Sequence, residues 1–284
     1  MLYLEAFIFP SASIEYDFLL SIKRTCYDSF YPFKVLAERG LERLDFEPIT
    51  LLYGGNGSGK STALHVIAEK LQLIRSATYN RSNFYETYVG LCEARQLEAI
   101  PKHSRIMTSD DVFDYMLDIR ALNQGVDNKR EILFKECLEA KYSDFKMKSL
   151  EDYEALKKIN SIRKSSQSKY VRKNLMDNIR EYSNGESALR YFNQKIEPDG
   201  LYILDEPENS LSPQRQLELV KVIEEGAHYL GCQFIIATHS PFFLALQGAK
   251  IYDLDEVPVG IKKWTELESV RFYQAFFKAH EDEF

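Results

Sequence analysis

The residues with the clearest chemistry are eight consecutive positions, Gly54-Gly55-Asn56-Gly57-Ser58-Gly59-Lys60-Ser61, which are followed by Thr62. Their spacing is the G-x-x-x-x-G-K-[ST] pattern of a phosphate-binding loop, or P-loop. Glycines let the backbone turn with positive φ and approach a phosphate closely. The backbone N–H groups and the positive end of a following helix attract the anion. The pattern predicts that Lys60 contacts the β- and γ-phosphates of a nucleotide and that Ser61 holds Mg²⁺.

The flanking sequence predicts the elements that this loop needs. Ile49–Tyr53 is an apolar run typical of a buried strand, and Lys60–Ile74 carries apolar residues at helical spacing. Strand, glycine-rich loop and helix in this order form the context in which the motif binds phosphate. With Gly near 7% of residues, a chance match is expected on the order of once in a hundred proteins of this length. An ordinary glycine-rich turn is therefore a weak alternative.

Three further sites follow along the chain: Tyr182-Ser183-Asn184-Gly185-Glu186-Ser187, Leu204-Asp205-Glu206-Pro207 and Ala237-Thr238-His239-Ser240. Each has an ordinary explanation when it stands alone. An acidic pair after a strand is often a surface turn, a single histidine is more often structural than catalytic, and S-x-G-E is a common helix cap. Their occurrence in this order after the P-loop favours a functional interpretation.

The order and spacing of the four sites resemble the ATPase domains of the ABC superfamily. The second site is then the signature motif, usually L-S-G-G-Q, from which Asn184 and Glu186 depart in the manner of non-transporter members. The resemblance implies ATP and Mg²⁺ as cofactors. It implies that Asp205 holds the Mg²⁺ shell, that Glu206 is the general base for the attacking water, and that His239 senses the γ-phosphate.

The same resemblance implies an active site shared between two copies of the chain. Ser183, Gly185 and Glu186, at a helix N-terminus, would contact the ATP bound by the other copy. The segment Asn209-Ser210-Leu211-Ser212 stands at the position of the D-loop, on the seam between copies. The expected assembly is an ATP-dependent, head-to-tail homodimer.

Finer features resemble one part of this superfamily. Asp205-Glu206-Pro207-Glu208, Leu211–Gln216 and Thr238–Pro241 are similar to the bacterial stand-alone ATPases usually labelled "AAA family", which are related to OLD-type nucleases and SMC-like DNA-repair ATPases. The resemblance is strong over residues 46–75 and 182–254 and weak over residues 76–181. No clear Gln-loop is present, and the candidates for its role are Gln96, Ser109 and Asp110.

The composition is that of a globular protein, with 45% hydrophobic and 28% charged residues. The net charge of −7 excludes a polycation, so any nucleic-acid contact must be a local patch. The N-terminus does not resemble a signal peptide, and no apolar run reaches the roughly 18 residues of a membrane span. The well-separated Cys26, Cys92, Cys137 and Cys232 indicate reduced thiols. These features predict a cytoplasmic protein.

The predicted fold is α/β, a P-loop NTPase of the ABC-ATPase type, with a mixed sheet flanked by helices, an N-terminal β layer and a helical insertion. Residues 1–284 form one such domain. Residues 1–100 are the N-terminal lobe with the P-loop, residues 101–181 the insertion, and residues 182–284 the lobe with the other three sites. Residues 76–99 are expected to be irregular. Asp110–Leu122 and Glu131–Tyr142 are expected to form separate helices. Tyr31 or Phe33 could stack on an adenine, although core packing is the commoner role of such residues.

A basic stretch within the insertion is the strongest charge feature. Residues 155–180 contain eight basic residues against one acid, Asp177, a local charge of +7. The basic residues are Lys157, Lys158, Arg163, Lys164, Lys169, Arg172, Lys173 and Arg180. Such a run can bind nucleic-acid phosphates, although a solvated helix face is commoner and the aromatics that favour single strands are nearly absent.

We therefore expect Mg²⁺-dependent ATP hydrolysis coupled to DNA or to a partner protein, in defence or repair. The first alternative is the ATP-binding subunit of a transporter, which would need a membrane partner and a true Gln-loop. The second is an ATP-gated binding module with little turnover.

Overall fold

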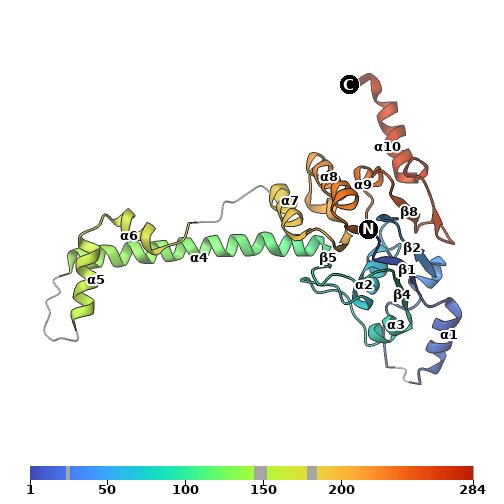
Figure 1. Cartoon of the computed structure of the whole chain (residues 1–284), viewed down its shortest axis with the longest axis horizontal. Helices are drawn as coiled ribbons and strands as arrows, with labels where there is room; N and C mark the ends of the chain where they lie inside the picture. Colours follow the sequence, from blue (N-terminus) through green and yellow to red (C-terminus); the bar gives the residue numbers. More distant parts are fainter. Residues whose placement is uncertain (24–25, 144–151, 178–183, 284) are drawn as a thin grey trace. The chain divides into compact units, whose positions relative to one another are not determined.

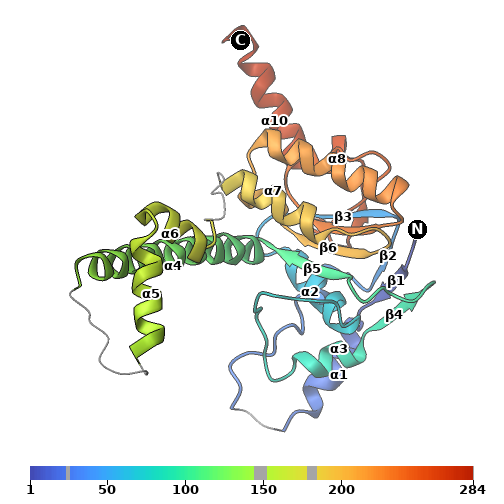
Figure 2. The ribbon, with the colours of Figure 1, turned by 60° about the vertical axis from the view of Figure 1, so that its left-hand side comes forward.

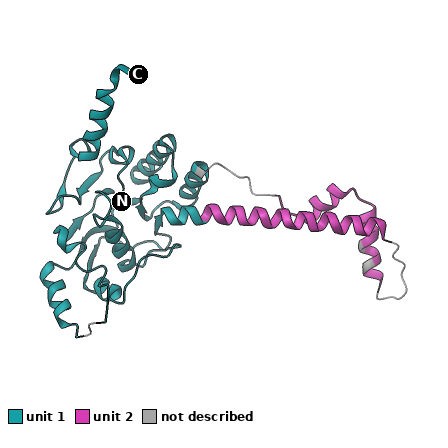
Figure 3. Cartoon of the chain, turned by 180° about the vertical axis from the view of Figure 1, so that it is seen from behind, with its two compact units in different colours: residues 1–114, 183–284 teal, residues 115–182 magenta. Residues whose placement is uncertain are grey.

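The computed structural model describes residues 1–23, 26–143, 152–177 and 184–283, without the side chains of residues 155, 158 and 184. The chain divides into a larger unit, residues 1–114 and 183–284, and a smaller unit, residues 115–182 (Figure 3). No helix in the described ranges is both long and apolar enough to span a membrane.

The larger unit contains all the described strands, in two sheets (Figure 1). The strands are β1 (Leu4–Ile8), β2 (Arg43–Asp45), β3 (Ile49–Tyr53), β4 (Glu93–Gln96), β5 (Arg105–Thr108), β6 (Leu201–Asp205), β7 (Gln233–Ala237), β8 (Lys250–Asp253) and β9 (Gly260–Ile261). The described helices are α1 (Ala12–Ser21), α2 (Lys60–Lys70), α3 (Tyr85–Leu91), α4 (Ser109–Tyr142), α5 (Tyr153–Arg163), α6 (Gln167–Asn174), α7 (Asn184–Lys195), α8 (Pro213–Tyr229), α9 (Pro241–Leu244) and α10 (Glu268–Ala279). Short 3-10 turns are η1 (Ala37–Arg39), η3 (Pro207–Ser210), η4 (Trp264–Glu266) and η5 (Glu281–Glu283).

The main sheet has the strand order β5-β6-β7-β3-β8-β9. The first five strands are parallel and β9 is antiparallel, so the sheet is mixed, as predicted. Every residue of β3, β6 and β7 is buried. Strands covered on both faces need apolar residues at each position, and α2 and α8 cover opposite faces of this sheet (Figure 2). The parallel arrangement brings the carboxyl ends of β3, β6 and β7 to one edge.

The predicted N-terminal β layer is the antiparallel sheet β2-β1-β4. It joins the main sheet through the buried Gln233 side chain, which accepts hydrogen bonds from the backbone N–H groups of Tyr3 and Leu4, both at 2.9 Å, and donates to the Leu4 carbonyl. The expectation of an irregular segment over residues 76–99 was wrong, because α3 and β4 lie there. Tyr85 and Tyr88 of α3 are fully buried, so packing of its aromatic side chains secures this short helix.

The segment after β4 differs from the expectation in two ways. β5, at residues 105–108, pairs with β6 in the main sheet, so the expected insertion of residues 101–181 would have included a strand of the larger unit. The two helices expected between residues 110 and 142 are one helix of 34 residues, α4. Asn123 and Val126, between the two predicted segments, are buried, so the packed face continues through them.

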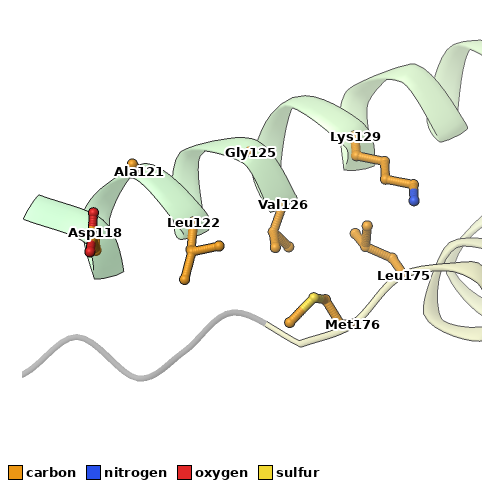
Figure 4. A pocket seen from close by; sticks show the side chains of 8 residues that line it. All are labelled: Asp118, Ala121, Leu122, Gly125, Val126, Lys129, Leu175 and Met176. Carbon is orange, nitrogen blue, oxygen red and sulfur yellow. The ribbon is translucent and has the colours of Figure 1, made fainter. Parts of the chain in front are cut away.

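The smaller unit has its own small core where α5 and α6 pack on α4. Cys137, Ala140 and Ile162 are buried together. Arg163 donates from Nε to the Ala140 carbonyl at 3.1 Å and also donates to the Ser143 carbonyl. A separate pocket of about 640 Å³ lies between α4 and the chain after α6, lined by Asp118, Ala121, Leu122, Gly125, Val126, Lys129, Leu175 and Met176 (Figure 4). It contains none of the predicted site residues.

Candidate functional site

The P-loop connects β3 to α2, and its conformation explains its glycines. Gly59, the residue before the helix, has φ +96°, and a Cβ there would lie 3.0 Å from Leu36 Cδ2. At Gly54 a Cβ would lie 2.6 Å from the Ser58 hydroxyl oxygen. α2 begins at Lys60, as the sequence predicted, so its free N–H groups and the positive end of its dipole adjoin the loop.

Lys60 is buried against its own loop. Its Nζ donates to the Gly54 carbonyl at 2.6 Å and to the Gly55 carbonyl at 3.0 Å, and lies 3.6 Å from Glu206 Oε1. The ammonium is therefore held inside the loop that the sequence predicted to cradle phosphate. An ammonium has three donors, and two of them are used by these carbonyls.

Ser61 and Asp205 are 144 positions apart in the chain and meet at the carboxyl edge of the sheet. The Ser61 hydroxyl donates to Asp205 Oδ1 at 3.1 Å. Burial, together with the smaller effect of the neighbouring Glu206, raises the pKa of Asp205 to about 6, although the Ser61 hydrogen bond and Lys60 act in the opposite direction. A hydroxyl and a carboxylate side by side are hard oxygen ligands of the kind that Mg²⁺ takes, and nucleotide-bound Mg²⁺ needs only one or two carboxylates.

Glu206 has an unusual backbone conformation, with φ 48° and ψ 55°. This left-handed region is uncommon for residues other than Gly and Asn, and such strain often marks functional sites. Its backbone N–H donates to the Ala237 carbonyl at 2.9 Å. The carboxylate accepts from Asn209 Nδ2 at 3.0 Å through Oε2, while Oε1 lies 3.8 Å from His239 Nδ1. Lys60, Glu206 and His239 thus form one cluster at the ends of three strands.

Two sequence families match the chain. The model of the family described as "ABC transporter" matches residues 43–209, more than half of the chain. The chain belongs to this family of ATPase domains. A second model, described as "AAA domain, putative AbiEii toxin, Type IV TA system", matches residues 178–245. The protein is an ABC-type P-loop ATPase, as predicted.

Three similar solved structures are distant from this chain in sequence. One is an Smc head domain with an extended coiled coil, bound to the C-terminal domain of ScpA, from Pyrococcus furiosus, with 14% identity, TM-score 0.45, and coverage of 97% of this chain and 100% of that chain. Another is an Smc head bound to the C-winged helix domain of ScpA, with 16% identity, TM-score 0.39, and coverage of 81% and 94%. A third, "a putative metal-chelate type ABC transporter" in an inward-facing conformation, has 16% identity, TM-score 0.38, and coverage of 82% of both chains. The chain matches no curated protein.

The expected signature motif of this ABC-type ATPase is only partly described. Ser183 lies outside the described residues. Gly185 and Glu186 are in the first turn of α7, where Glu186 Oε1 accepts from Arg215 Nη2 at 3.1 Å. A Cβ on Gly185 would lie 3.7 Å from Arg215 Cγ and 3.9 Å from the Ser210 carbonyl. The N-terminus of α7 therefore lies beside the expected D-loop.

The three candidates for the Gln-loop of the ATPase lie at different distances along the fold from the end of the Asp205 strand: two follow a neighbouring strand and one belongs to the other sheet. Thr108, the last residue of β5, pairs in register with Asp205. Ser109 and Asp110 follow directly, so they leave the sheet beside the Asp205 strand end. Gln96 is the last residue of β4, which belongs to the other sheet.

The two aromatic candidates for adenine stacking differ in whether their side chains reach the P-loop. The Tyr31 hydroxyl donates to the Thr62 hydroxyl oxygen at 3.2 Å, so this side chain reaches the P-loop helix. Phe33 is buried in the core and stacks on Phe18 with ring centroids 4.7 Å apart. Core packing accounts for Phe33.

Sequence reasoning missed three residues beside the ATPase site. Asp255, after β8, accepts the Gly55 N–H through both carboxylate oxygens, at 3.0 and 2.9 Å. His65 Nε2 lies 3.8 Å from Asp205 Oδ2. Glu208 accepts several hydrogen bonds from the segment around His239. His65 stands four positions after Ser61 on a predicted helix, which puts both on one face, so its place could have been inferred. Asp255 carried no local signal.

Proposed function

We propose that the chain hydrolyses ATP with Mg²⁺ at a composite site closed by a second copy of itself. The observation that carries the proposal is the meeting of Ser61, Asp205, Lys60, Glu206 and His239 at one edge of the sheet. Catalysis of phosphoryl transfer is largely positioning and charge neutralisation, and this cluster provides both.

Each group has a role in this proposal. The phosphate cradle is formed by the N–H groups of Asn56, Gly57, Ser58, Gly59 and Thr62, with Gly54 as the hinge of the loop. The Gly55 N–H joins it on leaving the Asp255 carboxylate. The Lys60 ammonium leaves the loop carbonyls and binds the β- and γ-phosphates. Ser61 and Asp205 hold Mg²⁺, which when bound neutralises phosphate charge.

The proton step belongs to Glu206. Its carboxylate lies between Lys60 and His239 and is about one quarter exposed, so a water molecule can reach it. We assign it to polarise the attacking water as general base, and we assign His239 to contact the γ-phosphate. Ser183, Gly185 and Glu186 complete the site of the other copy, with the phosphate at the N-terminus of α7.

The hydrolysis is coupled, we propose, to DNA or to a partner protein that the smaller unit contacts. Lys169, Arg172 and Lys173 are exposed on α6, and Lys164 is exposed in the turn between α5 and α6. Arg163 is engaged with the end of α4, so it contributes to packing there. The exposed basic side chains suit a phosphate backbone or an acidic protein surface.

Steady-state ATP hydrolysis tests the proposal. We expect Mg²⁺-dependent turnover by the wild-type chain, and ATP binding with turnover reduced about 100-fold or more in Glu206→Gln, because the general base is lost. Lys60→Ala, which removes the phosphate cation, is the control for loss of binding. Turnover of Glu206→Gln at the wild-type rate would disprove the assignment of the base. ATP binding without turnover by the wild type would favour the ATP-gated module.

A further inference from the structure

Glu208 is a buried carboxylate beside the proposed catalytic cluster. It lies in η3, and its side chain is about 5% exposed. Burying an ionised carboxylate costs several kcal/mol unless hydrogen bonds and charges compensate. An apolar residue would fill this space without that cost, so the presence of a carboxylate here requires another explanation.

Among the described residues, the hydrogen bonds that the Glu208 side chain accepts come from the chain between β7 and α9. Its Oε1 accepts from the Thr238 hydroxyl at 2.7 Å, from the His239 N–H at 2.9 Å and from the Ser240 N–H at 3.3 Å. Hydrogen bonds to an ionised acceptor are about twice as strong as neutral ones. One oxygen of Glu208 thus fixes the backbone that carries His239.

The same oxygen also faces the imidazole. His239 Nδ1 lies 3.5 Å from Glu208 Oε1 and 3.8 Å from Glu206 Oε1. Glu208 Oε2 is buried and has no hydrogen-bond partner among the described residues, so it adds acceptor capacity on this carboxylate. A carboxylate can only accept, so it favours the tautomer that has its proton on Nδ1 and leaves Nε2 free.

We propose that Glu208 is a positioning residue for ATP hydrolysis, which fixes the orientation and the Nδ1–H tautomer of His239. Because Glu208 belongs to η3, which overlaps the expected D-loop, it also links the seam between two copies to this histidine. The inference rests on the proposed function, in which His239 contacts the γ-phosphate.

Glu208→Gln is the first test, because it keeps the size and an acceptor oxygen and removes the charge. We expect kcat to fall about 10- to 100-fold, the range usual for groups that orient a reactive residue, with KM changed less than about twofold. Glu225→Gln removes an equal charge from an exposed position on α8 and should leave both constants unchanged. An unchanged kcat in Glu208→Gln overturns the proposal.

A double-mutant cycle separates action through His239 from general support of the fold. If Glu208 acts through the imidazole, Glu208→Gln should cost nothing further in a His239→Ala background. If the losses in kcat caused by the two substitutions multiply in the double variant, the proposal is overturned. Should Glu208→Gln not fold, Thr238→Val takes its place, because it removes one donor to Glu208 while keeping the side-chain shape. Its smaller loss should likewise vanish in the His239→Ala background.

The tautomer supplies a readout that does not depend on turnover. In ¹⁵N-histidine-labelled protein, the His239 signals should show the Nδ1–H tautomer in the wild type and a shift toward Nε2–H in Glu208→Gln. An unchanged tautomer overturns the proposal. Absence of ATP hydrolysis in the wild type would instead contradict the proposed function, while the tautomer would still decide the part played by Glu208.

Discussion

At Asp205 the folded protein binds a proton more readily than the unfolded chain does. Its pKa is raised from 3.8 to about 6, first by burial and then by Glu206. A raised acid pKa destabilises the fold at pH values where the group is ionised, since desolvation of the charge is not fully compensated. A bound cation would compensate the charge of this carboxylate and so stabilise its ionised form.

A pH series tests this property in the metal-free chain. As pH rises from about 4 to about 6, ionisation of Asp205 should lower the free energy of unfolding, by at most about 3 kcal/mol at 1.36 kcal/mol per pKa unit. Asp205→Asn cannot ionise and should lack this component. Urea unfolding of both proteins across the range measures the difference, and parallel curves would contradict the prediction.

Among the elements, α6 and the turn before it carry the exposed basic residues on which the prediction about nucleic acid rests. Changing Lys164, Lys169, Arg172 and Lys173 to Glu should weaken DNA binding at least tenfold and lower the salt dependence of the affinity, because each lost phosphate contact removes about 0.9 from the slope. Fluorescence anisotropy with and without ATP measures both quantities.

The matched control changes four exposed lysines of the larger unit to Glu: Lys23, Lys102, Lys221 and Lys278. If both variants lose affinity equally, only the net charge of the protein matters, and the basic surface on α6 and the turn before it is not involved. If the wild type does not bind DNA at low salt, the basic run is a solvated helix face.

The sequence predicted best the elements that local patterns define. β3 and the start of α2 flank a motif whose glycines and lysine are consecutive, so strand, loop and helix could be placed from a few residues. Ser61 and Asp205 are in contact in the structure, and only the order of the motifs suggested that these two segments lie near each other.

What the sequence did not predict depends on contacts between distant segments. β4 has mostly polar residues on a small second sheet, so it shows no apolar alternation. β5 is short, and its position in the sheet is set by pairing with β6, which lies almost a hundred residues later in the chain. Asp255 reaches Gly55 across 200 positions, and a single aspartate after a strand predicts no such contact.

For the whole molecule, the proposed shared site predicts complementation between defective chains. Lys60→Ala and Ser183→Arg should each be inactive alone, since each damages both seams of its homodimer. In a mixed dimer one seam carries both defects and the other carries neither. Partial ATPase activity should therefore appear on mixing, up to about half of the wild-type rate per dimer if the seams turn over independently.

Heterodimer formation must be verified in the same samples, for example with two affinity tags. If the mixture remains inactive although heterodimers form, the two seams act in concert or Ser183 does not act across the seam. If Ser183→Arg is fully active alone, its assignment to the signature motif is wrong.

The burial of the cysteines has a practical consequence. Cys92, Cys137 and Cys232 are buried, which limits access of a reagent to them. Burial also raises the pKa of Cys92 to about 12 and raises that of Cys232, so the thiolates of these two residues are scarce. Cys26 is exposed and lines a pocket together with Tyr31, whose hydroxyl contacts Thr62. A maleimide fluorophore should therefore attach to the native chain at one place, without removal of the other cysteines. A dye attached there would lie in the pocket that Tyr31 also lines, and Tyr31 connects this pocket to the P-loop helix.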